Sequence, residues 1–115
     1  MKYSIGHPWK LIPAAYAQLG KKQDCTRLVS NSLAAAGINF HGWPIEYFKL
    51  GYEVSYAQAQ PGDLIYYAVG GSNGLAHIAV YVGNGMSIHG GWNGNTVLYR
   101  YKYSTCSTPR FIRIK

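Results

Sequence analysis

Residues 77–89 read His77-Ile78-Ala79-Val80-Tyr81-Val82-Gly83-Asn84-Gly85-Met86-Ser87-Ile88-His89. Two runs of alternating side chains flank Gly83-Asn84-Gly85, and a glycine–asparagine cluster between such runs predicts a β-hairpin. A three-residue loop would place Ala79 opposite His89. His77 and His89 would then lie diagonally on one face, roughly 7–8 Å apart at the backbone. A two-residue loop would shift the pairing by one residue and put the histidines on opposite faces.

The two faces of this hairpin carry different side chains. One face is predicted to belong to the hydrophobic core, because it carries Ile78, Val80, Val82, Met86 and Ile88. The histidine face carries the small residues Ala79, Ser87 and Gly91, which leave room above the strands. We therefore predict that the histidines lie on the floor of a cleft.

Helical patterns precede the hairpin, and strand patterns dominate from Pro61 onward. A helix over Pro8 to Leu19 should start late or kink at Pro13. A second helix should begin after the N-cap Asp24 and end at Gly37, and a short helical turn should follow Pro44. The expected strands are Leu64 to Val69, Ala76 to Val82, Met86 to His89, Val97 to Tyr103 and Arg110 to Ile114.

This order of elements predicts one α+β domain over residues 1–115. Its N-terminal helices should pack on a C-terminal antiparallel sheet of about five strands. No apolar run approaches the roughly 20 residues of a membrane-spanning helix. His7, Pro8, Trp9 and Lys10 interrupt any signal-peptide core, so we expect synthesis in the cytoplasm and delivery by another route.

The charge balance indicates the kind of partner. Eleven Lys+Arg against four Asp+Glu give a net charge of +7, which favours an anionic partner or surroundings. The basic residues are scattered, and no nucleic-acid-binding signature is present, so we expect no nucleic-acid partner. We expect a monomer that needs no cofactor.

Cys25 follows Asp24 at the start of the second predicted helix, in Gln23-Asp24-Cys25-Thr26-Arg27-Leu28-Val29. The helix dipole and the free N–H groups there favour a thiolate and can bind an oxyanion. With His77 as base and His89 as the group that orients it, Cys25 would be the nucleophile of a cysteine hydrolase. Asp63 or an asparagine is an alternative to His89.

Structural explanations compete with this hypothesis. A free cysteine in a helix is about ten times more often a small buried hydrophobe than a nucleophile, and a histidine in an apolar strand usually belongs to the core. Cys25, His77 and His89 could also be three zinc ligands, but no close-spaced ligand pair is present, so we predict no metal site. Cys106 lies in a Ser/Thr-rich turn, and we expect both thiols to be free.

Three segments resemble one known family in their order and spacing, over about Ala14 to Gly90. They are Asp24 to Val29, Pro61 to Tyr67, and His77 to Gly90. These segments are similar to the NlpC-type cysteine peptidases (the NlpC and p-sixty family). The resemblance implies a papain-like fold and hydrolysis of peptidoglycan stem peptides, typically between D-γ-glutamyl and diaminopimelate or lysine. It implies Cys25 as nucleophile, His77 as base, His89 as third polar residue, and Asp24 as a contact to the amino end of the stem peptide.

The sequence departs from the family pattern in two places. The family usually has Asp-Cys-Ser-Gly, whereas Thr26 and Arg27 follow Cys25 here, so Thr26 replaces a substrate-contacting serine. The family's upstream Tyr-x-Trp-Gly-Gly segment, whose tyrosine serves the oxyanion hole, is absent. We expect Gln23 or Tyr16 to replace that donor.

The leading functional hypothesis is a peptidoglycan hydrolase similar to a phage lysin, which lyses the cell wall after release through a pore or by secretion. A phage tail component and a secreted antibacterial effector are alternative contexts. An N-acetylmuramoyl-L-alanine amidase would use the same three catalytic residues. A non-catalytic wall-binding module is the alternative from another class, with Trp92 beside Asn93 and Asn95 lining a glycan or peptide groove.

Overall fold

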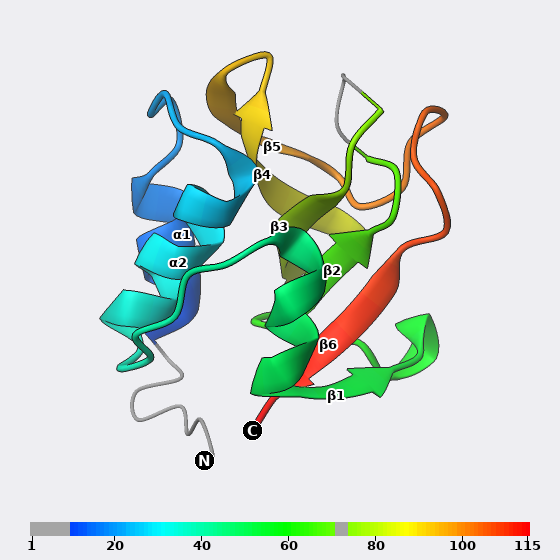
Figure 1. Ribbon diagram of the computed structural model, residues 1–115, viewed down its shortest axis with the longest axis horizontal. Coiled ribbons are helices and arrows are strands. Elements are labelled where there is room, and N and C mark those ends of the chain that lie inside the picture. Colours follow the sequence, from blue (N-terminus) through cyan, green and yellow to red (C-terminus); the bar gives the residue numbers. More distant parts are fainter. Residues whose placement is uncertain (1–9, 71–73) are drawn as a thin grey trace.

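The computed structural model describes residues 10–70 and 74–115. Its strands form one antiparallel sheet in the order β1-β6-β2-β3-β4-β5. Figure 1 shows α1 and α2 side by side next to this sheet, and α2 contacts β3 and β4. The predicted papain-like α+β architecture is confirmed. The elements are α1 (Leu11–Ala17), α2 (Cys25–Ala35), the 3₁₀ helix η2 (Pro44–Leu50), β1 (Gly51–Val54), the 3₁₀ helix η3 (Tyr56–Gln58), β2 (Leu64–Tyr67), β3 (His77–Gly83), β4 (Met86–Trp92), β5 (Asn95–Arg100) and β6 (Arg110–Ile114).

Both α-helices begin where local chemistry favours a start. Helix α1 starts late, as predicted, so Pro13 lies in its first turn, where a missing N–H costs no intrahelical hydrogen bond. Pro8 and Trp9, the expected start, lie outside the described residues. At α2 the Asp24 side chain accepts a hydrogen bond from the backbone N–H of Arg27 at 2.7 Å, which confirms the predicted N-cap. Within the described residues, no helix has the length and apolar character needed to cross a membrane.

The β3–β4 hairpin reaches the predicted register by an unexpected route. Its turn has two residues, Asn84 and Gly85, and both have positive φ. Gly83 therefore pairs with Met86, but a bulge between Tyr81 and Gly83 adds one residue on β3. Tyr81 then pairs with Ser87, as a three-residue loop would require. The bulge thus keeps the two histidines on one face.

The sheet has six strands rather than five. The additional strand, β1, pairs with β6 at the sheet edge and has only four residues, of which Tyr52 and Glu53 are exposed. So short a strand gives no clear alternating pattern. Strand β5 also ends at Arg100 rather than at Tyr103 as predicted. The chain beyond Arg100 folds back, and the Tyr103 hydroxyl donates a hydrogen bond to the carbonyl of Gly70.

A hydrophobic cluster covers each face of the sheet. The helix face buries Leu64, Ile78, Val80, Ile88 and Ile112 together with the apolar sides of α1 and α2. The opposite face buries Ile65, Tyr67, Ala79, Tyr81 and Phe111, with Tyr101, Tyr103 and Cys106 packed against them.

The predicted cleft floor on the histidine face is found only at His77 and Gly91, which line pockets. Ala79, Ser87 and His89 are each 0% exposed, because aromatic rings cover them. Tyr67 and Tyr103 pack with ring centroids 6.1 Å and 5.8 Å from that of His89. Ala79 and Ser87 therefore lie beneath these rings rather than on an open floor, whereas Gly91 lines pockets.

Replacing Ile88 with Ala should lower the free energy of unfolding by about 3 kcal/mol, because Ile88 is fully buried in the helix-facing cluster. Leu98 pairs with Ile88 across β4 and β5 but is 41% exposed. Leu98→Ala is therefore the matched control and should cost less than about 1 kcal/mol. Urea denaturation measures both values, and equal losses would contradict this assignment of the core.

Candidate active site

Strands β3 and β4 bring His77 and His89 into direct contact. Nε2 of His77 lies 3.0 Å from Nδ1 of His89, within hydrogen-bond distance. The rings are nearly parallel, with an interplanar angle of 9° and centroids 5.2 Å apart. The predicted placement of the two histidines on one face is confirmed.

A backbone carbonyl fixes the protons of this pair. Nε2 of His89 lies 3.1 Å from the carbonyl oxygen of Arg100, which can only accept a hydrogen bond. A neutral His89 therefore carries its proton on Nε2 and accepts at Nδ1. His77 must then donate from its own Nε2, which leaves its Nδ1 without a proton. Nδ1 of His77 is thus the nitrogen that can act as a base.

Cys25 and His77 line the same cleft, which has a volume of about 470 Å³. Cys25 is the first residue of α2 and is partly buried, and His77 is the first residue of β3 and is 4% exposed. Cys25 is a free thiol. The rest of the cleft is formed by Asp24, Thr26, Trp43, Pro44, Ile45, Tyr66, Leu75, Ala76, Gly90 and Gly91.

Two glycines let β4 approach the start of α2. A Cβ atom on Gly90 would lie 2.5 Å from the carbonyl oxygen of Asp24 and 2.7 Å from the Cβ of Leu28, so no side chain fits there. Gly91 has φ of +67° and donates its N–H to the carbonyl of Gln23 at 2.7 Å. These contacts place Asp24, and with it the start of α2, against β4, the strand that carries His89.

Burial controls the charge states of the catalytic candidates. It raises the pKa of the Cys25 thiol, and the charge of Asp24 acts in the same direction. Backbone hydrogen bonds, chiefly that of Ile78, lower the thiol pKa but do not outweigh burial. Burial, with a smaller contribution from His89, lowers the pKa of His77 to about 3. The predicted lowering of the thiol pKa is therefore wrong in direction. The raised thiol pKa and the lowered imidazole pKa both favour the neutral pair over a thiolate and an imidazolium at neutral pH.

Comparison with known proteins gives this geometry a context. The model of the NlpC/P60 family matches residues 8–115 of the chain. The chain belongs to the NlpC/P60 family. The resemblance found in the sequence is therefore confirmed, and it extends beyond Gly90 through the last two strands.

Individual relatives differ in what they do. The chain is 37% identical over 71 residues, 62% of its length, to the probable endopeptidase p60 of Listeria seeligeri, and it spans 13% of that protein. The solved structure of the peptidoglycan hydrolase RipB from Mycobacterium tuberculosis has 25% identity and a TM-score of 0.73, covering 94% of this chain and 65% of that one. RipD from the same organism, described as a non-catalytic NlpC/P60 domain adapted to peptidoglycan binding, has 21% identity and a TM-score of 0.73, covering 94% of this chain and 97% of that one.

In this NlpC/P60 domain, the two predicted side-chain oxyanion donors lie away from the cleft. The Gln23 amide donates to Oε1 of Gln18 and to Oγ1 of Thr96, each at 3.0 Å, so both its hydrogens are used in an internal network. Tyr16 lies on α1, is 41% exposed and does not line the cleft. The remaining donors in the first turn of α2 are the backbone N–H groups of Cys25 and Thr26, because that of Arg27 is used by the Asp24 cap.

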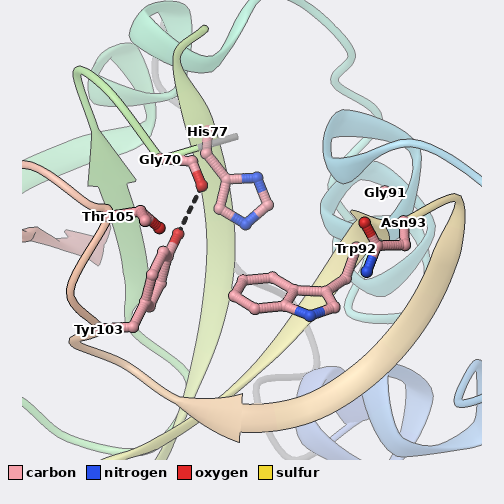
Figure 2. Close-up of a pocket in the computed structure, with 7 residues that line it drawn as sticks. All are labelled: Gly70, His77, Gly91, Trp92, Asn93, Tyr103 and Thr105. Carbon is pink, nitrogen blue, oxygen red and sulfur yellow. Dashed lines mark hydrogen bonds between the residues drawn. The ribbon is translucent and has the colours of Figure 1, made fainter. Parts of the chain in front are cut away.

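The other predicted residues are divided between two pockets. Asp24 and Thr26 line the Cys25 cleft, and the Thr26 hydroxyl donates to Oδ1 of Asp24 at 3.0 Å. Trp92 lines a neighbouring pocket with His77 (Figure 2). Among the described residues, no three His, Cys, Asp or Glu side chains form a group that could hold a metal ion.

The exposed apolar rim of the cleft was not predicted. Trp43 is 76% exposed, Ile45 51% and Leu75 62%, and all three line the Cys25 cleft. Large apolar side chains gathered around a cleft are typical of a binding site. In the sequence they are scattered over loops and a 3₁₀ helix, so no periodic pattern marks them.

Acid should destabilise this domain through its buried histidines. Burial lowers the pKa of His89 from 6.5 to about 4. Between pH 6.5 and pH 4, His89 therefore binds a proton in the unfolded chain but not in the folded one. The free energy of unfolding should change little between pH 7 and 8 and fall between pH 6.5 and 4, by up to about 1.4 kcal/mol per pH unit for each histidine.

The variant His89→Gln should show a shallower fall, because one titrating imidazole is gone. Urea denaturation at pH 4.5, 5.5, 6.5 and 7.5 measures both slopes. Identical slopes in the two proteins would mean that His89 is not held neutral by burial.

Proposed function

We propose that this NlpC/P60 domain hydrolyses peptidoglycan stem peptides, with Cys25 as nucleophile, His77 as base and His89 as the residue that orients His77. One observation carries the proposal. The thiol at the head of α2 shares a cleft with an imidazole whose far nitrogen is bonded to His89. A nucleophile, a base and an orienting group in that order are what covalent hydrolysis requires.

The reaction follows from this arrangement. Nδ1 of His77 takes the proton of the Cys25 thiol as the sulfur attacks the peptide carbonyl, and N–H groups at the start of α2 bind the oxyanion. The C–N bond then breaks, and the amine leaves with the proton from His77. Water, activated by His77, attacks the resulting thioester, which releases the carboxylate product and restores the thiol.

Asp24 and the overall charge support a peptidoglycan substrate. Oδ1 of Asp24 holds the cap of α2, whereas Oδ2 accepts no hydrogen bond from any other described residue. A carboxylate oxygen in the cleft suits the amino end of a stem peptide. The net charge of +7 favours a cell wall rich in anionic polymers. We propose the bond between D-γ-glutamyl and diaminopimelate or lysine as the one cleaved.

Hydrolysis is preferred over wall binding alone because the reactive groups are complete. Family membership does not decide between them, since RipD is described as non-catalytic. This protein has Cys25, His77 and His89. His77 is hydrogen-bonded to His89, and His89 is hydrogen-bonded to the Arg100 carbonyl. A binding module has no use for two buried imidazoles held in one tautomer.

Cys25→Ala should abolish the release of peptides from purified cell wall, by at least about 1,000-fold, because no other group can form the thioester. The matched control is the second free thiol, Cys106, which lies in a turn and donates a hydrogen bond to the backbone carbonyl of Tyr103. Cys106→Ala should retain activity. Undiminished activity in Cys25→Ala, with normal circular dichroism, would exclude the proposed mechanism.

Mass spectrometry of the released fragments identifies the bond. A new free amine on diaminopimelate or lysine, together with a D-glutamate carboxylate, is expected. Fragments that begin with L-alanine, with the peptide freed from the lactyl group, would instead establish an N-acetylmuramoyl-L-alanine amidase.

A further inference from the structure

A second pocket adjoins the Cys25 cleft at His77 and Gly91, which line both. We call it the aromatic pocket, and it has a volume of about 220 Å³. Its other walls include Trp92 from the end of β4, Asn93 from the following turn, and Tyr103 and Thr105 from the segment between β5 and β6. Segments far apart in the chain thus meet beside the proposed base (Figure 2).

The aromatic walls are held in place by their own contacts. The rings of Trp92 and Tyr103 meet at 83°, with centroids 4.9 Å apart, and form a corner. The Tyr103 hydroxyl donates to the carbonyl of Gly70 at 2.7 Å, which ties the β5–β6 segment to the segment that follows β2 (Figure 2). Trp92 also packs against His89, with centroids 5.1 Å apart. The pocket is therefore preformed.

The lining of the pocket selects a kind of side chain. Among the described residues it contains aromatic faces, an amide, a hydroxyl and the imidazole of His77, but no carboxylate, lysine or arginine. Aromatic faces attract ammonium groups by a cation–π interaction and also cover an aliphatic stem. A side chain with several methylene groups and a terminal amine satisfies both properties.

The proposed reaction places one part of the substrate beside this pocket. His77 must protonate the amine that leaves, so the residue carrying that amine lies next to His77. The acyl part is bonded to Cys25 and lies in the cleft that also contains Asp24. The leaving-group residue then extends towards the neighbouring pocket that His77 also lines.

We propose that the aromatic pocket binds the side chain of the leaving-group residue, an aliphatic amine, and that Trp92 is its specificity-determining wall. This inference rests on the proposed hydrolysis. It assigns the two pockets to opposite sides of the scissile bond. It also explains why a domain of net charge +7 can accept a cationic side chain, since the pocket is lined by aromatic faces and, apart from the imidazole of His77, by no basic side chain.

Two synthetic peptides test the assignment. They are identical except that lysine or norleucine follows the D-γ-glutamyl residue. Both side chains have four carbons, and norleucine lacks only the terminal ammonium. The unaltered protein should hydrolyse the lysine peptide with a kcat/KM about fivefold higher. A ratio near one would overturn the proposal without any variant.

Substitutions at Trp92 then locate the effect. Trp92→Leu should lower kcat/KM for the lysine peptide about fivefold and change the norleucine value less than twofold, so that the preference disappears. Trp92→Phe keeps an aromatic face and should retain most of the preference. The matched control is Trp43→Leu in the Cys25 cleft, which should lower both values equally and leave the ratio intact.

Other outcomes separate this inference from the proposed function. An unchanged lysine preference in Trp92→Leu overturns the subsite while the hydrolase stands. An equal loss for both peptides in Trp92→Leu, with slower alkylation of Cys25 by iodoacetamide, also overturns it and would make Trp92 a support for His89. If the unaltered protein hydrolyses neither peptide and no cell wall, the proposed function itself is overturned.

Discussion

The close approach of β4 to the first turn of α2 is the constraint on which the site depends. It requires glycine at two successive positions, because the backbone of Asp24 occupies the space of any side chain on Gly90. The N–H of Gly91 closes the contact by donating to Gln23. The thiol of α2 is thereby brought to the strand that carries His89, and His77 on the paired strand lines the same cleft. A helix and a hairpin that pack only through large side chains would lie farther apart.

Two buried imidazoles are costly to keep, and the surrounding structure explains how they are tolerated. Both stay neutral because burial lowers their pKa values. Nε2 of His77 and both ring nitrogens of His89 have hydrogen-bond partners. The Arg100 carbonyl fixes the direction of donation along the pair. Rings of Tyr67, Tyr103 and Trp92 exclude water from His89. A rigid, neutral pair of this kind favours a base that accepts its proton only as the sulfur attacks.

Two of the three aromatic rings that protect His89, those of Trp92 and Tyr103, also form walls of the second pocket. Trp92 contacts His89 on one side and borders the pocket on the other, and Tyr103 does the same. In our proposal, the same side chains therefore support the base and contact the leaving group. The Cys25 cleft differs, because its rim of Trp43, Ile45 and Leu75 is largely exposed. The two pockets thus offer different chemistry on the two sides of His77.

Local chemistry in the sequence determined the capped start of α2 at Asp24, the β3–β4 hairpin and the shared face of His77 and His89. These features depend on residues close together in the chain, where capping and alternation act directly. Only the tertiary structure decided that aromatic rings would cover the histidine face, that Gln23 would be used in an internal network, and that burial would raise rather than lower the pKa of Cys25. Each of these results depends on segments distant in sequence, such as residues 101–106 folding back over β3 and β4. Burial and solvation are properties of the assembled fold, and no local pattern contains them.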